Sequence, residues 1–548
     1  MTGFKLQTFS GQAPKIYARL LPEDMAQTAV NCRLDSGRLE PWNANASASI
    51  TPVGSYSISA ATKTLFKYSD SIWIGSNDDL NIVRSPIAED PHERIYVTGG
   101  SAGFPQMTTA AIVGNNTYYR LGLPKPADLT SVTLAPATSA NVDTEVPVSR
   151  AYIFTYVSAY GEEGVNCDAE VSQVVTIHTD QTATLDFPPN PSGAHNLLFK
   201  RVYRTDSNGT FRFVATVDIA NDTFADTVAD IALGEEIPTS TFNAPPDDIA
   251  ADHKDGPLLG LVSMPNGILA GFSGQTVSFS EAFQPHAFPD GYKLTVKSDV
   301  IALAPLNTGL LVLTKEKPAI VQGLDPSSMG MMEVDSTLSC VSKRSVVDMG
   351  EFVMYACPDG LVMATDGGLN LITDQTFSRE QWQALVPSSI VAFQWEGHYV
   401  AFYSTGSENK GFIFDPRGGK NSYVTLDFHA TAGFNDLEND QLYLVVSGSV
   451  VKFGEGSTSL NYIWRGKKFY SPRPINPAVA KVECDAYSPN PVFKLYADGV
   501  LKHTQTVTNS NVFRLPSGYK ANEFEFELSG SVSVNEVCIY ESAEEIGA

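Results

Sequence analysis

Five stretches in the second half of the chain decide the fold, each made of an apolar run, a polar turn and a second apolar run. They read GILAGFSGQTVSFSE (267–281), GLLVLTKEKPAIVQG (309–323), EFVMYACPDGLVMAT (351–365), GHYVAFYSTGSENKGFIFDP (397–416) and QLYLVVSGSVVKFGE (441–455). Their starts are spaced about 40–45 residues apart, which is the length of a β-propeller blade. One such sheet cannot bury both faces alone, but sheets packed around an axis bury them and leave only short edges.

Two weaker units of the same kind precede these five, one in residues 64–83 and one in residues 94–124. We therefore predict an all-β chain whose main part is a β-propeller of six or seven blades. Its first blades are expected in residues 51–130 and the remaining blades in residues 247–465. Ordinary meandering antiparallel sheet is the alternative, and the regular spacing of the five units favours the propeller.

Two further β-domains are expected beside the propeller. The segment AYIFTYVSAYGEEG (151–164) alternates strongly, and a hairpin with an Asp-Ser-Asn-Gly turn follows it, which is a good hairpin signal. These features predict an inserted, fibronectin III-like β-sandwich in residues 147–240. From residue 470 to residue 548, alternating strands with a hairpin at Asp498-Gly499 predict a small C-terminal β-sandwich.

Helical periodicity is scarce, and only two short helices are expected. One is predicted over residues 22–32, where two acidic residues would face the positive end of the helix dipole. The other is predicted over residues 378–385, where Ser378 and Gln381 have the spacing of a capping box. Almost every other segment has the pattern of short strands between Gly, Asn, Asp and Pro turns.

The composition restricts the class of partner. The chain has 548 residues and a formal net charge of −24, so most of its surface should repel polyanions, and tight binding to nucleic-acid phosphates is not expected. The six cysteines form no C-x-x-C pair, and we expect buried free thiols rather than a metal site or disulfides. No signal peptide and no apolar run long enough for a transmembrane helix are visible.

A search for catalytic motifs returns almost nothing. The nucleophile elbow, the zincin motif, the phosphate loop and the EF-hand spacing are all absent, and no pair of the eight histidines has metal-ligand spacing. A glycan-cleaving propeller needs only two carboxylates, but the aspartate-box turn of sialidases is absent. We therefore predict that the chain is not an enzyme and holds no cofactor and no metal. The aromatic segment FSEAFQPHAFP (279–289) is either a recognition loop or, as we prefer, a blade-to-blade connection pinned by aromatic residues.

Several segments resemble the tail nozzle proteins of short-tailed bacteriophages, also called tail tubular protein B or tail hub proteins. They are FSEAFQPHAFPDGY (279–292), LLVLTKEKPAIVQGLDP (310–326), CVSKRSVVDMGEFVMYACPDGLVMAT (340–365) and REQWQALVPSSIVAFQWEGHYVAFY (379–403). The N-terminal APKIYARLLPEDMAQTAVNCRLDSGRLEPW (13–42) is similar to the segment through which that family enters its propeller. The resemblance covers most of the chain and is strongest from residue 250 to residue 465.

The resemblance implies a structural subunit of the virion, assembled in the host cytoplasm. It implies a homohexameric ring below the portal and adaptor proteins, contacts with tail fibres or spikes, and a channel for DNA in transit without sequence-specific binding. We expect residues 1–50 to be an entry and assembly segment, and we expect deletion of residues 1–40 to prevent incorporation into tails while leaving a soluble propeller. A receptor-binding or adhesin propeller at the tail tip is the alternative function.

Such a channel should be acidic or neutral, because phosphate contacts along a basic wall would retain the DNA. Repulsion between an acidic wall and the duplex extends over a Debye length of roughly 8–10 Å. Acidic residues in polar turns are therefore the candidates for the channel wall. They are Asp78, Asp79, Asp325, Asp359, Glu408 and Glu438.

Overall fold

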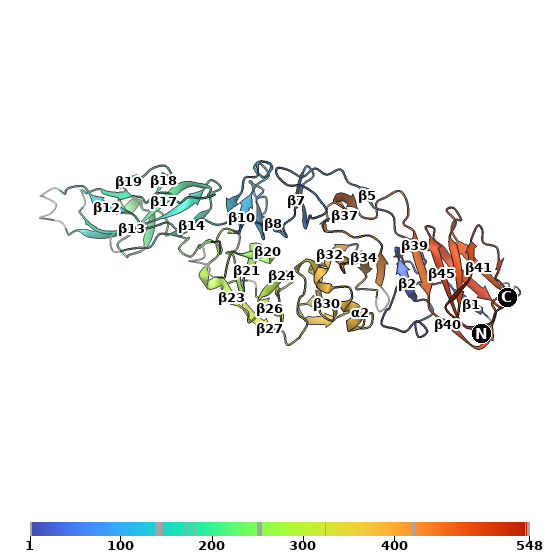
Figure 1. Ribbon diagram of the computed structural model, residues 1–548. Coiled ribbons are helices and arrows are strands. Elements are labelled where there is room, and N and C mark those ends of the chain that lie inside the picture. Colours follow the sequence, from blue (N-terminus) through green and yellow to red (C-terminus); the bar gives the residue numbers. More distant parts are fainter. Residues whose placement is uncertain are drawn as a thin grey trace. The chain divides into compact units, whose positions relative to one another are not determined.

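The computed structural model describes residues 3–137, 144, 146–170, 173–178, 181–248, 255–323, 325–418, 423–542 and 544. The chain is all-β, with 46% of its residues in strands and 5% in helices. It divides into two compact units (Figure 1). The first unit comprises Met1–Asn77, Leu313–Pro318 and Glu333–Ala548, and the second comprises Asp78–Val312 and Ala319–Met332.

Three four-stranded antiparallel sheets form the scaffold of the second unit. The first sheet has the order β11 (Tyr119–Arg120), β10 (Gln106–Thr108), β9 (Ile95–Thr98) and β8 (Asn81–Arg84). The second has the order β20 (Leu259–Ser263), β21 (Leu269–Ser273), β22 (Thr276–Phe279) and β23 (Lys293–Thr295). The third has the order β24 (Val300–Leu306), β25 (Gly309–Thr314), β26 (Ala319–Gln322) and β27 (Gly330–Glu333). Each sheet has one edge strand that comes first of its four strands in the chain, namely β8, β20 and β24. These three strands are neighbours, because β20 contacts both β8 and β24.

The first unit repeats the same design. One row of strands is β28 (Val347–Asp348), β29 (Val353–Cys357), β30 (Gly360–Thr365) and β31 (Gly368–Leu371), and the next is β32 (Val391–Trp395), β33 (His398–Ser404), β34 (Asn409–Phe414) and β35 (Tyr423–Leu426). A third row is β36 (Ala432–Asp436), β37 (Gln441–Val446), β38 (Ser449–Lys452) and β5 (Ala46–Ser47). The strands β6 (Thr64–Ser69) and β7 (Ile72–Ser76) form a pair. Here too the first strands are neighbours, because β32 contacts β28 and β36, and β36 contacts β6.

The five stretches that decide the fold are confirmed as hairpins. Four of them form the second and third strands of four-stranded sheets, namely β21–β22, β25–β26, β29–β30 and β37–β38. The fifth, β33–β34, has the same place in the row β32–β35, which is part of a ten-stranded sheet. Their apolar residues form the cores between successive sheets within each unit. Leu310 and Val312, for example, share a buried cluster with Ala270 and Val277 of the preceding sheet.

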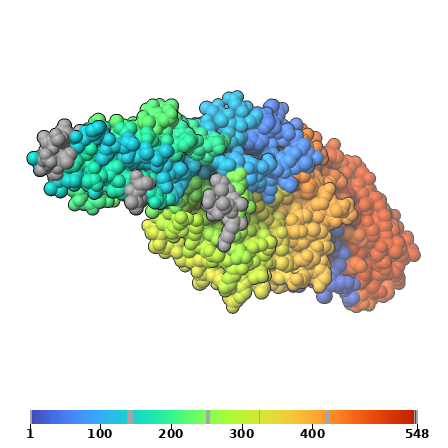
Figure 2. Space-filling model, turned by 60° about the vertical axis from the view of Figure 1, so that its left-hand side comes forward, coloured from blue at the N-terminus to red at the C-terminus, as the bar shows by residue number. Residues whose placement is uncertain are grey.

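The second unit also contains two sheets that share a single core. One sheet has the order β12 (Ser131–Leu134), β16 (Ala183–Asp186) and β19 (Thr223–Asp226), and the other has the order β14 (Glu163–Asn166), β13 (Val148–Ser158), β17 (Leu197–Thr205) and β18 (Phe211–Asp218), with β15 (Val174–Ile177) beside β13. We call this part the insert; its surface is cyan to green in Figure 2. Tyr152, Phe154, Leu185 and Val202 lie at the centre of the core. The insert begins before residue 147, since β12 belongs to it.

The C-terminal part of the first unit packs two sheets around another core. One has the order β1 (Gly3–Leu6), β46 (Val534–Tyr540), β41 (Val479–Cys484) and β44 (Phe513–Arg514). The other includes β39 (Tyr462–Gly466), β40 (Phe469–Ile475), β45 (Ala521–Gly530), β42 (Val492–Ala497) and β43 (Val500–Thr506). We call this part the C-terminal sandwich. The predicted hairpin joins β42 to β43, with Asp498 and Gly499 both at positive φ, 44° and 76°.

Two expectations about the N-terminal residues need correction. The segment predicted as a helix over residues 22–32 contains β2 (Ala26–Val30), which pairs with β35 on one side and β39 on the other (Figure 1). Because β2 lies inside this sheet, and β1 and β5 complete two others, residues 1–50 are not a removable arm. They are structural strands of the first unit.

The second predicted helix is confirmed. The helix α2 (Arg379–Gln383) begins after Ser378, whose side chain accepts a hydrogen bond from the backbone N–H of Gln381. In return, the side-chain oxygen of Gln381 accepts a hydrogen bond from the backbone N–H of Ser378 over 2.9 Å. This reciprocal pair is the capping box that the sequence predicts.

Candidate functional site

The acidic candidates of the first unit lie in turns between strands. Asp359 is in the β29–β30 turn and is 2.8 Å from the guanidinium of Arg379. Glu408 is exposed beside the β33–β34 turn and is 2.9 Å from Lys410. Glu438 is exposed in the β36–β37 turn. Two of the three carboxylates therefore have a cation beside them.

These turns do not occupy equivalent positions. In an antiparallel meander, successive connections lie at alternating ends of the strands. Asp359 and Glu408 lie in connections between second and third strands, whereas Glu438 lies between a first and a second strand. If the sheets repeat in one orientation, Glu438 is at the opposite end from the other two. The proposal of one acidic wall must then be restricted to a subset of the candidates.

The acidic candidates of the second unit have local hydrogen bonds. Asp78 accepts one from the backbone N–H of Ser101 over 3.0 Å. Asp79 follows it before β8, and both are half-buried. Asp325 is exposed and accepts bonds from the hydroxyl and the backbone N–H of Ser327, which hold the pKa of its carboxyl below the ordinary value. All three act as turn carboxylates within their own unit.

A different site becomes visible where the N-terminal segment joins two parts of the first unit. Because β2 pairs with both β35 and β39, it continues the sheet of β32–β35 into the C-terminal sandwich as one ten-stranded sheet. Gln12, nearly buried, donates its side-chain amide to the carbonyl oxygen of Ala29 over 2.6 Å. The ring of Phe9 meets Trp464 edge-on at 5.0 Å. We call this region the N-terminal joint.

The loop after Ala13 fastens the joint to α2. Gln381 of α2 donates its side-chain amide to the carbonyl oxygen of Pro14 over 2.7 Å. The backbone N–H of Lys15 donates to the carbonyl oxygen of Thr376 over 2.9 Å. At its other end, the backbone N–H of Lys468 donates to the carbonyl oxygen of Ala18 over 3.0 Å. The loop thus contacts both the sheets and the C-terminal sandwich.

Large apolar side chains on this loop face solvent. Tyr17 is 64% exposed and Leu20 is 75% exposed, and Tyr470 on β40 is 45% exposed. The guanidinium of Arg19 lies 3.6 Å from the centre of the Tyr470 ring. A cluster of exposed aromatic and cationic groups of this kind is typical of protein interfaces.

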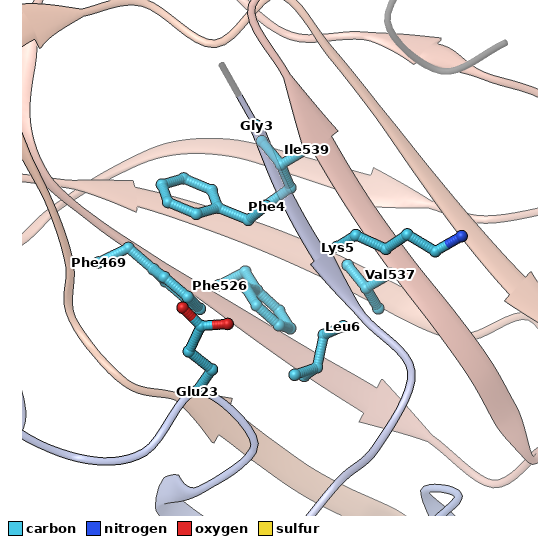
Figure 3. A pocket seen from close by; sticks show the side chains of 9 residues that line it. All are labelled: Gly3, Phe4, Lys5, Leu6, Glu23, Phe469, Phe526, Val537 and Ile539. Atoms are coloured by element: carbon cyan, nitrogen blue, oxygen red, sulfur yellow. The ribbon is translucent and has the colours of Figure 1, made fainter. Parts of the chain in front are cut away.

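A small pocket opens beside the same loop, between the two sheets of the C-terminal sandwich (Figure 3). Its volume is about 50 Å³ and its walls are mostly apolar. Phe4 and Leu6 of β1 line one side, and Phe469 and Phe526 line the other, while the carboxylate of Glu23 is the one acidic group among the lining residues. The pocket has room for one small apolar group and contains no candidate nucleophile.

A larger cavity of about 260 Å³ lies at the other face of the joint. Its polar lining includes His398, whose Nε2 is 3.6 Å from a carboxylate oxygen of Asp35, and Asp415. Burial lowers the pKa of His398, but the hydrogen bond and charge of Asp35 outweigh it, so the pKa is raised. Such a pair can hold a proton. The lining also includes Ser10, whose hydroxyl donates to Asp24 over 2.6 Å, and Cys32, a buried thiol whose pKa burial raises.

In the second unit, the segment 279–289 is pinned, but it is not the blade-to-blade connection expected from the sequence, because it joins β22 to β23 within one sheet. His286 is 2% exposed, and its Nε2 is 3.0 Å from the carbonyl oxygen of Glu163 in the insert. Arg94, also buried, bridges Asp90 and Glu162 at 2.7 Å each. These contacts fix the insert to the sheets β8–β11 and β20–β23.

The cysteines have the state expected from the sequence. All six are buried and free. Burial raises the pKa of Cys167, Cys340 and Cys484 to about 12 in each case. Thiols of that kind are inert at neutral pH. Among the described residues, no group of three His, Cys, Asp or Glu side chains could hold a metal ion.

Comparisons with known proteins add little to these observations. No protein-family model matches the chain, and no curated protein matches it. The chain is similar to virginiamycin B lyase from Staphylococcus aureus, with 9% identity, a TM-score of 0.25 and coverage of 69% of this chain and 98% of that one. It is similar to the extracellular domain of the putative one component system BT4673 from B. thetaiotaomicron, with 8% identity, a TM-score of 0.27 and coverage of 95% and 82%.

A third solved structure, YCF48 from Cyanidioschyzon merolae, has 11% identity, a TM-score of 0.20 and coverage of 68% of this chain and 94% of that one. TM-scores this low carry no argument about fold or function. Among the described residues, no helix has the length and apolar character needed to span a membrane.

No local pattern in the sequence predicts the N-terminal joint or the contact of the insert with segment 279–289. Residues 13–42 carry the family resemblance and the pattern of a short helix, and the interior strand β2 that forms there depends on partners near residues 425 and 463. His286 stands out in the sequence only as part of an aromatic segment. An exposed Tyr or Leu beside a buried neighbour, such as Leu20 beside Leu21, is the one local sign that a loop presents a surface.

Proposed function

We propose that the chain is a structural subunit of a short-tailed phage tail, in which copies form a nozzle ring around the channel for DNA ejection. The sequence resemblance in residues 13–42 and 250–465 carries the proposal.

The proposal includes a β-propeller of seven blades, one for each of the seven successive sheets. The supporting observation is that first strands neighbour first strands within each unit, which is the arrangement of blades around an axis. The last sheet takes its fourth strand, β5, from the N-terminal segment. An exchange of this kind would fasten the end of a propeller to its beginning. The fibronectin III-like identity of the insert belongs to the same proposal.

The N-terminal joint supports a structural role. A subunit of a tube through which DNA is driven must not flex between its parts. The ten-stranded sheet carries backbone hydrogen bonds without interruption from β32 to β43, and such a continuous ladder resists bending better than a loop linker. The insert is fixed to the sheets of the second unit by the buried ion pair between Arg94 and Glu162 and by the contact of His286 with the carbonyl oxygen of Glu163; we call this contact region the insert joint.

The outer partners in this proposal are portal or adaptor ring proteins and tail fibres or spikes. The exposed cluster of Tyr17, Leu20 and Tyr470 is a surface suited to one of them. The acidic channel wall remains part of the proposal, now limited to turns at one end of the sheets. The net charge of −24 on each copy favours repulsion of the duplex.

The test is imaging of the purified full chain by negative-stain electron microscopy. Rings with an axial hole, six-fold in symmetry, support the nozzle. Monomers or trimers at every concentration contradict it and favour the adhesin. A second measurement is DNA binding at low salt, where a nozzle subunit should leave a 30-bp duplex unbound.

A further inference from the structure

One edge of the C-terminal sandwich is open. The strand β43 is the last strand of its sheet and pairs with β42 alone. Within the described part of the chain, no backbone hydrogen bond reaches the outer side of Thr504–Thr506. Val500 is 55% exposed and Leu501 is 48% exposed at the start of the strand. An edge with these properties is a template for a further strand.

The stretch that contains β43 is basic in an acidic protein. Residues 500–520 contain Lys502 on β43, Arg514 on β44 of the other sheet and Lys520 in the loop before β45, and neither Asp nor Glu, while the whole chain carries −24. All three cations are exposed. The strand that suits this edge must therefore be acidic. Nucleic acid is a poorer partner for this edge than an acidic strand. Its phosphates would contact the cations but would leave the backbone groups of β43 and the exposed Val500 and Leu501 without partners.

The chain itself contains an acidic edge that fits. Residues 218–236 contain six carboxylates and no Lys or Arg. Two of the six, Asp226 and Asp230, form ion pairs with the buried Arg204, and Asp218 lies at the end of β18 in the other sheet. Among the described residues, β19 is the last strand of its sheet and pairs only with β16. Asp218, Asp222 and Glu236 are exposed, and Ile231 is 98% exposed between the acidic groups. The two stretches thus combine opposite charge, an open strand edge and exposed apolar side chains.

We propose that β43 of one copy pairs with β19 of a second copy of this chain. The contact is heterologous, because different surfaces meet, and a contact of that type produces a closed ring or an open filament. This inference rests on the proposed function in that it names the lateral contact of the ring. It differs from the exposed cluster on the N-terminal loop, which stays free for other partners.

The test uses charge reversal in the full chain. The basic-edge variant carries Lys502→Glu, Arg514→Glu and Lys520→Glu, and the acidic-edge variant carries Asp218→Lys, Asp222→Lys and Glu236→Lys. Association is measured by analytical ultracentrifugation. Each variant alone should associate about tenfold or more weakly than the unchanged chain, because like charges then face each other. An equimolar mixture should recover association, since each reversed edge meets its reversed partner.

A matched control carries Lys63→Glu, Lys315→Glu and Arg417→Glu, three exposed cations elsewhere, and should associate as the unchanged chain does. If both edge variants associate as strongly as the unchanged chain, the inference is overturned, even if rings form and the nozzle proposal stands. A chain that stays monomeric overturns it too. Filaments that depend on both edges support it and contradict the ring. Binding of a 30-bp duplex that the basic-edge variant abolishes, with association unchanged, overturns it in favour of nucleic acid.

Discussion

The imidazole Nε2 of His286 lies 3.0 Å from the backbone carbonyl oxygen of Glu163, at the contact between the insert and the β20–β23 sheet. A carbonyl oxygen only accepts, so Nε2 carries the hydrogen and the neutral imidazole has a free lone pair on Nδ1. Within the described residues, that Nδ1 is buried without a hydrogen-bond partner. Protonation there would place an unpaired charge inside the joint.

The insert joint should therefore weaken in acid. Burial lowers the pKa of His286, a shift that the neighbouring Glu162 and Glu163 oppose and Arg94 reinforces. Because the folded pKa lies below the unfolded value of about 6.5, the stabilisation is complete above pH 6.5 and is lost as pH falls through the folded pKa. The protection factors of the amides in residues 239–244, which correct for the intrinsic pH dependence of exchange, should fall between pH 7 and pH 5. His286→Gln, which keeps an amide donor and cannot titrate, should remove that fall; protection factors in the native chain that do not change with pH would contradict the assignment.

His398 should show the opposite dependence. Asp35 raises its pKa despite burial, so the pair stabilises the fold below pH 6.5, and this contribution is lost as pH rises through the folded pKa. Asp35→Asn should lower the pKa of His398, measured by NMR titration, below about 6.5, because burial then dominates. Asp415→Asn, which removes a more weakly acting carboxylate, should lower it less. An equal fall in both variants would mean that Asp35 has no special role.

Local signals explain which parts of the fold the sequence could predict. The capping box of α2 lies within four residues, and the five hairpins join strands that follow each other directly. The free state of the cysteines and the preference for a pinned segment at 279–289 also come from neighbouring residues. These features need no knowledge of distant contacts, because turn chemistry and capping act over a few residues.

The remaining features depend on contacts that are distant in sequence. The helix expected over residues 22–32 is wrong because β2 bonds to β39 and β35, and such tertiary partners override weak helical propensity. The strand β5 pairs with β38 (Ser449–Lys452), which is distant from it in the sequence. The acidic candidates lie in turns as predicted, but a sequence cannot show at which end of its sheet a turn lies.

The N-terminal joint should be intolerant of charge at its interior face. Ala29 on β2 is 0% exposed and lies in the core of the C-terminal sandwich, so an Asp there would place a carboxylate among apolar side chains. Ala29→Asp should cost about 3 kcal/mol or more, the cost typical of an uncompensated buried charge, and should leave much of the chain insoluble. Thr28→Asp, on the half-buried neighbour, should have a much smaller effect. Urea unfolding checks both variants, and a soluble, stable chain lacking residues 1–40 would contradict the structural role of this segment.

The last prediction concerns the core of the insert, where Arg204 and Asp226 are both fully buried and form an ion pair. Asp226 also accepts a hydrogen bond from the Tyr152 hydroxyl over 2.8 Å. Arg204 has a second partner in Asp230, at 2.6 Å. Arg204→Met leaves the buried Asp226 carboxylate without its cation and should lower the free energy of unfolding by about 3–5 kcal/mol. Asp226→Leu leaves Arg204 paired with the exposed Asp230 and should lower it less.

The double variant separates pairing from simple burial. Arg204→Met with Asp226→Leu removes both charges and fills the space with apolar groups, so it should cost much less than the sum of the single changes. Arg212→Met, at an exposed pair with Asp206, is the control and should cost less than about 1 kcal/mol. The free energies are measured by urea unfolding, followed by the hydrogen exchange of β13 and β17. If the single costs simply add in the double variant, the two side chains act independently and the pair does not hold the insert together.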